Sequence, residues 1–174
     1  MRAARSVCWA PEGLGGAAVH ALKYEGWTNA ARGMAREMVR LSWPRDVVEE
    51  RRALVPVPLA AARLRERGFN QSALLAEALA AAWDLPVWND VLQRTRSTTS
   101  QTRLTPGERL TNVAGAFRAA ESAGGGRRGR LRGAHVVLVD DVVTTAATLN
   151  ACAAALVGGG ARITSYVTFG RARA

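Results

Sequence analysis

The sequence predicts an α/β protein, one domain over residues 1–174, built on an open, mostly parallel twisted sheet flanked by helices. An apolar, β-branched run at residues 136–139 is too short for a helix and is typical of a parallel strand covered on both faces. Two acids and several small residues follow it, and residues 149–157 then have helical composition. The chain is long enough, and at 48% hydrophobic residues apolar enough, for a full core.

The first 50 residues are expected to form an N-terminal helical hood. Leucine and alanine recur with helical spacing over residues 11–24, and Gly26 marks the end of that helix. A second helix is predicted over residues 30–41, where two methionines and a leucine share one face. We interpret these methionines as core packing.

The middle of the chain alternates between short strands and a helix. Residues 53–58 predict a strand that breaks into a proline-rich turn, because proline cannot continue a central strand. Residues 72–83 are rich in alanine and leucine and favour a helix. Two short strands are expected at residues 86–88 and 91–94.

The second half of the chain begins with a polar tract at residues 95–103, which lacks periodicity and predicts an exposed, mobile loop able to close over an anionic substrate. A capping box predicts a helix over residues 105–112, followed by a short strand from residue 116. The Gly- and Arg-rich segment 119–133 is expected to be a flexible surface connection. A final strand is predicted at residues 163–169.

The acids Asp140 and Asp141 end the predicted central strand, at the sheet edge where ligands bind in open α/β folds. The first turn of the next helix offers N–H groups that an anion can satisfy. Carboxylates beside such a cradle suit a ribose 5-phosphate, with its vicinal hydroxyls and its phosphate. The alternative is a strand end with helix-capping residues, although adjacent like charges are unfavourable without partners. The predicted cradle is Thr144, Thr145, Ala146, Ala147 and Thr148.

A second phosphate-facing loop is predicted after the strand at 53–58, because arginines crowd the segment before Gly68. The competing interpretation is that these arginines lie on a solvated helix face. The candidates in this segment are Arg63 and Arg67.

The formal net charge is +10, and Lys23 is the only lysine among the 24 Lys and Arg residues. Arginine favours phosphorylated ligands or nucleic acid, while a high-GC genome would give the same bias. No apolar stretch approaches the roughly 20 residues of a membrane span, so we expect no membrane insertion and a cytoplasmic location. Cys8 and Cys152 alone predict neither a zinc site nor a disulfide framework. The oligomeric state is left open by the sequence.

The stretch from residue 136 to 148 resembles the phosphoribosyl pyrophosphate (PRPP) signature of type I phosphoribosyltransferases, with Ala146 where the family usually has glycine. Further blocks resemble the ComF family of competence-associated, phosphoribosyltransferase-like proteins, although the N-terminal four-cysteine zinc module of many relatives is absent. These blocks are Leu22-Lys23-Tyr24 with Gly26, Val55-Pro56-Val57-Pro58, Arg67-Gly68-Phe69-Asn70-Gln71 and Ser100-Gln101-Thr102-Arg103-Leu104.

The resemblance implies a type I phosphoribosyltransferase fold, with Mg²⁺-dependent PRPP binding and transfer of the ribosyl phosphate to an acceptor in nucleotide salvage or DNA uptake. Asp140 and Asp141 would bind the ribose hydroxyls and Mg²⁺, directly or through water. With Arg63 and Arg67 they are the candidate catalytic residues. The implied pyrophosphate loop is Val57, Pro58, Leu59 and Gly68, and further lid or anion contacts are Lys23, Ser100, Gln101 and Arg103.

Two other functions compete with this enzyme. The net charge and the Arg-rich connection favour a non-catalytic protein that senses PRPP or handles single-stranded DNA. A hydrolase acting on a phosphosugar is the third hypothesis. The acceptor is not identified by composition.

Overall fold

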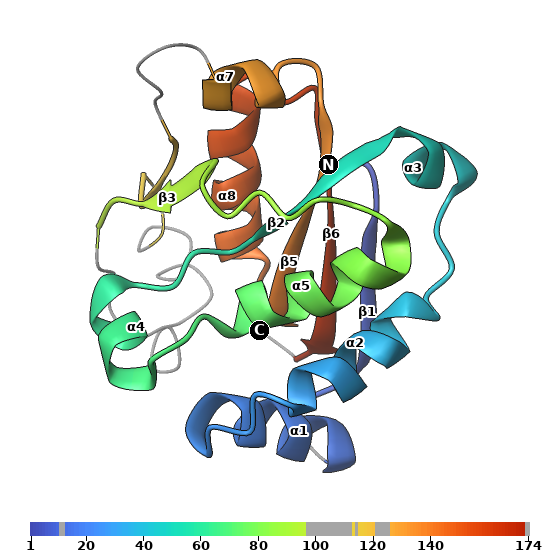
Figure 1. Cartoon of the computed structure of the whole chain (residues 1–174), viewed down its shortest axis with the longest axis vertical. Helices are drawn as coiled ribbons and strands as arrows, with labels where there is room; N and C mark the ends of the chain where they lie inside the picture. Colours follow the sequence, from blue (N-terminus) through green and yellow to red (C-terminus); the bar gives the residue numbers. More distant parts are fainter. Residues whose placement is uncertain (11–12, 97–112, 114, 121–125, 173–174) are drawn as a thin grey trace.

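The computed structural model describes residues 1–10, 13–96, 113, 115–120 and 126–172 (Figure 1). A four-stranded, fully parallel sheet lies at its centre in the order β1-β6-β5-β2. A separate antiparallel pair, β3-β4, lies beside it. The predicted open, mostly parallel sheet is therefore confirmed. The strands are β1 (Ala4–Trp9), β2 (Arg51–Pro56), β3 (Leu92–Arg94), β4 (Phe117–Ala119), β5 (His135–Val143) and β6 (Ile163–Arg171).

Helices cover both faces of this sheet (Figure 1). On one face α2 and α5 pack against β5, β6 and β2, with α1 next to α2, and on the other face α8 packs against β5, β6 and β4. This explains the uninterrupted apolar run of β5, because successive side chains enter opposite cores. The helices are α1 (Gly13–Tyr24), α2 (Ala30–Val39), α3 (Arg45–Glu50), α4 (Ala61–Arg67), α5 (Gln71–Trp83), α7 (Gly126–Leu131) and α8 (Ala147–Gly158).

The central strand β5 is longer than the sequence predicted. Residues 136–139 are fully buried, as expected. The strand then continues past both acids, because Val142 and Val143 pair with Gly170 and Arg171 of β6. Asp140 and Asp141 are therefore the sixth and seventh of the nine residues of the strand, where backbone pairing fixes their direction.

We predicted a helical hood over residues 1–50, but this segment is not helical throughout. It begins with β1, which pairs in parallel with β6 at the edge of the sheet. This strand was not predicted from the sequence because an edge strand is only half buried and can therefore contain polar residues. Ser6 Oγ lies 2.7 Å from Thr168 Oγ1 of β6, so the two hydroxyls satisfy each other.

The segment 119–133, predicted to be a flexible connection, contains an ordered helix, α7. Leu131 is fully buried, and the Arg130 guanidinium donates to the Asp90 carboxylate at 2.7 and 2.8 Å. The same guanidinium lies 5.5 Å from the centre of the Trp88 ring. These long-range contacts override the loop-like composition. The predicted loop and helix over residues 97–112 lie outside the described residues.

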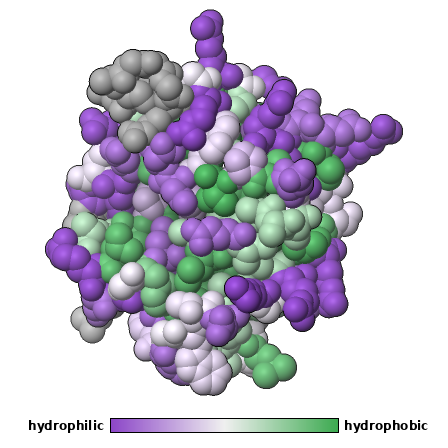
Figure 2. Space-filling view, viewed as in Figure 1, coloured by the Kyte–Doolittle hydropathy of each residue, from purple (hydrophilic) through white to green (hydrophobic). Residues whose placement is uncertain are grey.

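The face formed by α2 and α5 is apolar in its middle, where Figure 2 shows hydrophobic residues bordered by hydrophilic ones. A cavity of about 790 Å³ lies between the two helices, with Ala35, Val39 and Leu74 among its lining residues. It contains none of the predicted site residues. In the part of the chain that the structure describes, no helix is both long and apolar enough to cross a bilayer.

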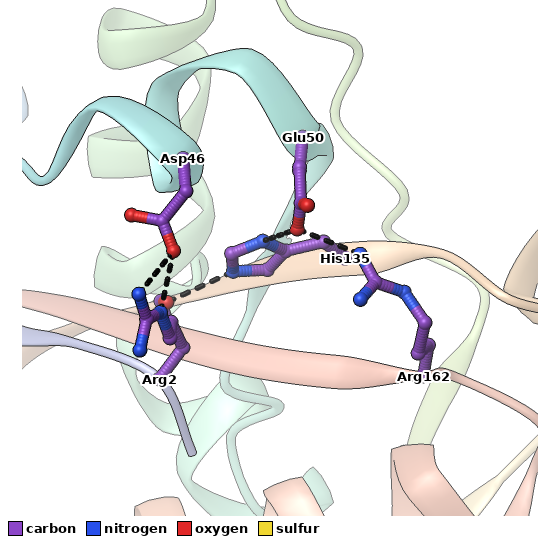
Figure 3. A network of polar contacts seen from close by, with 6 residues as sticks. Arg2, Asp46, Glu50, His135 and Arg162 are labelled. Carbon is purple, nitrogen blue, oxygen red and sulfur yellow. Dashed lines mark hydrogen bonds and ion pairs between the residues drawn. The ribbon is translucent and has the colours of Figure 1, made fainter.

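A polar network lies at the N-terminal end of β5, at the opposite end of the strand from the acids (Figure 3). The buried His135 ring places Nε2 2.9 Å from Ser165 Oγ and Nδ1 3.8 Å from Glu50 Oε2. Arg162 donates to that Glu50 oxygen at 2.6 Å, and the Arg2–Asp46 pair lies beside them. Burial lowers the pKa of His135 below its usual 6.5, more than Glu50 raises it.

Acid is therefore expected to destabilise the protein through His135. Because the folded state holds this ring neutral while the unfolded chain protonates it near pH 6.5, this stability is complete above that pH and declines below it. In urea unfolding, the change in stability between pH 7.5 and pH 5.5 should be less unfavourable for His135→Leu than for the unaltered protein, whereas His20→Leu, at an exposed site, should change as the unaltered protein does. The same change in all three proteins would contradict this role.

Candidate functional site

The predicted cradle forms a turn between β5 and α8. Ala146, at the N-terminal end of α8, has left-handed backbone angles (φ 59°, ψ 10°). Thr145 Oγ1 accepts a hydrogen bond of 3.4 Å from the Ala147 amide. A small depression of about 30 Å³ is lined by Asp140 together with Thr144, Ala146, Ala147 and Thr148. One acid and the start of the helix thus border the same space.

Ala146 carries a conformational cost that glycine would not have. An L-residue in the left-handed region is disfavoured by roughly 1–2 kcal/mol. We expect Ala146→Gly to raise the free energy of unfolding by about 1 kcal/mol, measured in urea. Ala151→Gly, within α8, is the matched control and should lower it by a similar amount. A loss in both variants would mean that residue 146 is not left-handed in solution.

The two acids differ in their environment. Asp141 is buried, and its Oδ2 forms an ion pair with Lys23 Nζ of α1. Asp140 Oδ1 accepts hydrogen bonds from Ser72 Oγ at 2.8 Å and from the Asp141 amide at 3.0 Å. Burial, and next the Asp141 carboxylate, raise the pKa of Asp140 from 3.8 to about 7, against the opposing effects of Ser72 and Lys23. The pair therefore carries less than two full negative charges at neutral pH.

A basic cavity of about 470 Å³ lies between α1 and α4. Arg67 donates to Gln71 Oε1 at 2.6 Å, and its guanidinium lies 5.5 Å from the centre of the Tyr24 ring. Lys23 lines this cavity and also contacts Asp141, so one side chain lies at both the cavity and the acid pair. Its lining residues are Lys23, Tyr24, Gly26, Arg63, Glu66, Arg67 and Phe69.

The residues of the predicted pyrophosphate loop do not line this cavity. Gly68 ends α4 with a left-handed φ of 81°, which turns the chain back toward α5. Val57 is buried, and Pro58 and Leu59 are half buried. None of these four residues lines the cavity, which is lined by residues of α1 and α4 together with Gly26 and Phe69. Ser100, Gln101 and Arg103 lie outside the described residues.

The start of α5 carries three contacts that the sequence did not assign to the site. Asn70 caps the helix by accepting from the Ser72 amide at 3.0 Å, and its Nδ2 donates to the Val57 carbonyl at 3.0 Å. Gln71 orients Arg67, and Ser72 orients Asp140. The asparagine before an Ala/Leu-rich run indicates the cap. The partners of Asn70 and Ser72 could not be predicted from a local pattern, because they lie 13 and 68 residues away in the chain.

The acid pair by itself supplies only a few of the ligands that a magnesium ion needs. The described residues contain no group of three or more His, Cys, Asp or Glu that could hold a metal. Asp141 Oδ2 already has Lys23, and Asp140 Oδ1 already has two donors. Since Mg²⁺ prefers octahedral oxygen ligands, water molecules or the phosphate and hydroxyl oxygens of a substrate would complete its shell.

Comparisons with known proteins show the family of this chain. Residues 50–174 match the family model described as Phosphoribosyl transferase domain. Competence protein F of Haemophilus influenzae is 38% identical over 98 residues, which cover 56% of this chain and 41% of that protein. DNA utilization protein YhgH of Salmonella typhi is 34% identical over 155 residues, covering 82% and 61%. Competence protein ComFC of Bacillus subtilis is 34% identical over 115 residues, covering 65% and 42%. The chain thus spans less than two thirds of the length of these relatives.

Proposed function

Because the chain belongs to the phosphoribosyl transferase domain family, as a ComF-type member, we propose that it binds PRPP with magnesium and transfers the ribosyl phosphate to a nitrogen acceptor. One observation carries this proposal. Asp140 and the N-terminal turn of α8 line the same depression, so an acceptor for hydroxyl protons lies beside donors for a phosphate. A ribose 5-phosphate carries both hydroxyl groups and a phosphate in one small molecule.

Each part of the substrate has a counterpart in the site. Asp140 and Asp141 accept hydrogen bonds from the two ribose hydroxyls. The N–H groups at the start of α8 bind the 5-phosphate, where the helix dipole also favours negative charge. The pyrophosphate enters the basic cavity, where Arg63 and Arg67 on α4 neutralise it.

Transfer requires the bond between C1 of the ribose and the pyrophosphate oxygen to break and a bond from C1 to the acceptor nitrogen to form. The electron pair of the broken bond leaves on the pyrophosphate, and the acceptor nitrogen loses its proton to water. Positioning and stabilisation of the leaving-group charge lower the barrier, which suits a site where arginines surround the leaving group. Bound magnesium would add positive charge at the pyrophosphate oxygens.

Removing the arginines of the basic cavity should weaken PRPP binding selectively. We expect Arg63→Ala with Arg67→Ala to lower the affinity for PRPP by about 10- to 100-fold, because two charge-assisted contacts are lost. Ribose 5-phosphate has no pyrophosphate, so its affinity should not change. Arg65→Ala, on the same helix but outside the cavity, is the control for calorimetry. Equal losses for both ligands would place the pyrophosphate elsewhere.

The proposal as a whole is tested by calorimetry with PRPP and Mg²⁺. Saturable binding of PRPP, and of ribose 5-phosphate more weakly, supports it. The absence of binding by either compound would overturn it. Release of pyrophosphate only when a nitrogen base is added distinguishes transfer from hydrolysis of PRPP alone.

A second candidate function is the handling of single-stranded DNA during DNA uptake. The net charge of +10 favours it, as do the names of the relatives, which refer to competence and DNA utilization. A DNA-binding groove would give an affinity that falls steeply with salt, because phosphate contacts release counterions. A flat salt series with weak binding would instead favour the phosphoribosyltransferase.

A further inference from the structure

The Lys23 side chain connects α1 to the acid pair. It extends from the last turn of α1, and its ammonium forms the ion pair with Asp141 Oδ2 of β5. The two side chains are only 22% and 5% exposed, so this pair is far less screened by water than a surface ion pair. A buried carboxylate that lost such a partner would be strongly unfavourable.

The residue type at this position is also distinctive. Lys23 is the only lysine among the 24 Lys and Arg residues, so every other basic position carries arginine. An ammonium is a compact charge with three donors, whereas a guanidinium is a planar fork. Of the two, the ammonium is closer in shape to a small cation seated against carboxylate oxygens.

We propose that the Lys23 ammonium is the resident cation of the Asp140–Asp141 pair and excludes a divalent metal ion from it until a ligand arrives. This inference rests on the proposed function. The described residues offer no third acid, histidine or cysteine that could form a metal site with the pair. A divalent ion at the pair would therefore face the ammonium with few protein ligands to offset the repulsion.

The Lys23 side chain also lies at the basic cavity, which offers it a second set of contacts. It lines the basic cavity together with Arg63 and Arg67, where the pyrophosphate is proposed to bind. When PRPP arrives with its metal ion, the ammonium leaves Asp141 and contacts the pyrophosphate. Binding of PRPP and its metal ion is thereby linked to the position of α1, because Lys23 belongs to that helix.

The test uses Mn²⁺ alone, followed by electron paramagnetic resonance on the full chain without PRPP. We expect negligible binding to the unaltered protein and to Lys23→Arg, and one bound Mn²⁺ in Lys23→Met, with affinity at least tenfold higher. Lys23→Met with Asp141→Asn should lose that binding again. Equal Mn²⁺ binding by the unaltered protein and Lys23→Met, whether strong or absent, would overturn the proposal.

A second measurement needs no substitution. Reductive methylation with ¹³C-formaldehyde keeps the charge and gives one lysine signal in NMR spectra, since the chain has a single lysine. Millimolar Mg²⁺ alone should leave this signal unchanged, and Mg²⁺ with pyrophosphate should move it. A shift with Mg²⁺ alone, or none with pyrophosphate present, would contradict the proposal. Because the metal-only experiments involve no PRPP, a failure of PRPP binding would be recognised separately.

Discussion

Replacing both acids, as Asp140→Asn with Asp141→Asn, is expected to weaken PRPP binding by about 100-fold or more. Hydrogen bonds to a charged group contribute about 1.5–3 kcal/mol each, and roughly 1.4 kcal/mol corresponds to a factor of ten. Asparagine retains an oxygen that can accept from Ser72, so the contact at the start of α5 is preserved. Calorimetry with PRPP and Mg²⁺ measures the loss.

The matched control for the acid pair is Asp84→Asn. Asp84 lies at the far end of α5 in a left-handed conformation that asparagine also adopts readily. This variant should bind PRPP with unchanged affinity. Circular dichroism should show that both variants are folded. Undiminished PRPP binding by the double variant would remove the acids from the site.

Leu138→Ala is expected to cause the largest loss of stability, about 2–5 kcal/mol in the free energy of unfolding. Leu138 is fully buried in the core between β5 and α8, two residues before the first acid. The lost methyl groups leave a cavity because the surrounding core can relax only in part. Urea unfolding should show a lower midpoint with little change in the denaturant slope.

The control for this prediction is Val157→Ala, at a half-exposed position near the end of α8, which should cost about 0.5 kcal/mol or less. At a temperature where Leu138→Ala is still folded, its affinity for PRPP per folded molecule should remain close to that of the unaltered protein. Equal stability of the two variants would show that the core beneath the acids is not packed as described.

The sequence predicts the strands and helices whose burial stays the same along their length. The run at 136–139 is buried on both faces, so its composition alone identifies β5, and the small residues after the acids identify the turn before α8. The position of the turn that carries the proposed cradle could be predicted for the same reason, since the acids and the helix start are adjacent in the chain. The left-handed Ala146 follows from the family pattern that places glycine there.

Contacts between distant parts of the chain were not predictable. The partner of Asp141 comes from α1, and the hydroxyl that bonds Asp140 comes from the start of α5. No periodicity or spacing encodes such pairs, because they depend on how α1 and α5 pack on the sheet. The edge strand β1 was missed because half-buried strands tolerate polar residues, and α7 because one buried leucine outweighs a glycine-rich composition.

The start of α5 connects the two regions for which phosphate contacts are proposed. Asn70 holds the Val57 carbonyl, Gln71 holds Arg67, and Ser72 holds Asp140. Three consecutive residues thus connect the loop after β2, the basic cavity and the acid pair. A displacement of this helix end would disturb all three regions at once.

The most direct measurement is a crystal structure of the protein with PRPP or ribose 5-phosphate. We expect the 5-phosphate at the N–H groups of Ala147 and Thr148, with the ribose hydroxyls within hydrogen-bond distance of Asp140 and Asp141. A sugar phosphate bound at another place, or a turn at 144–148 that directs its carbonyl oxygens toward the depression, would contradict it.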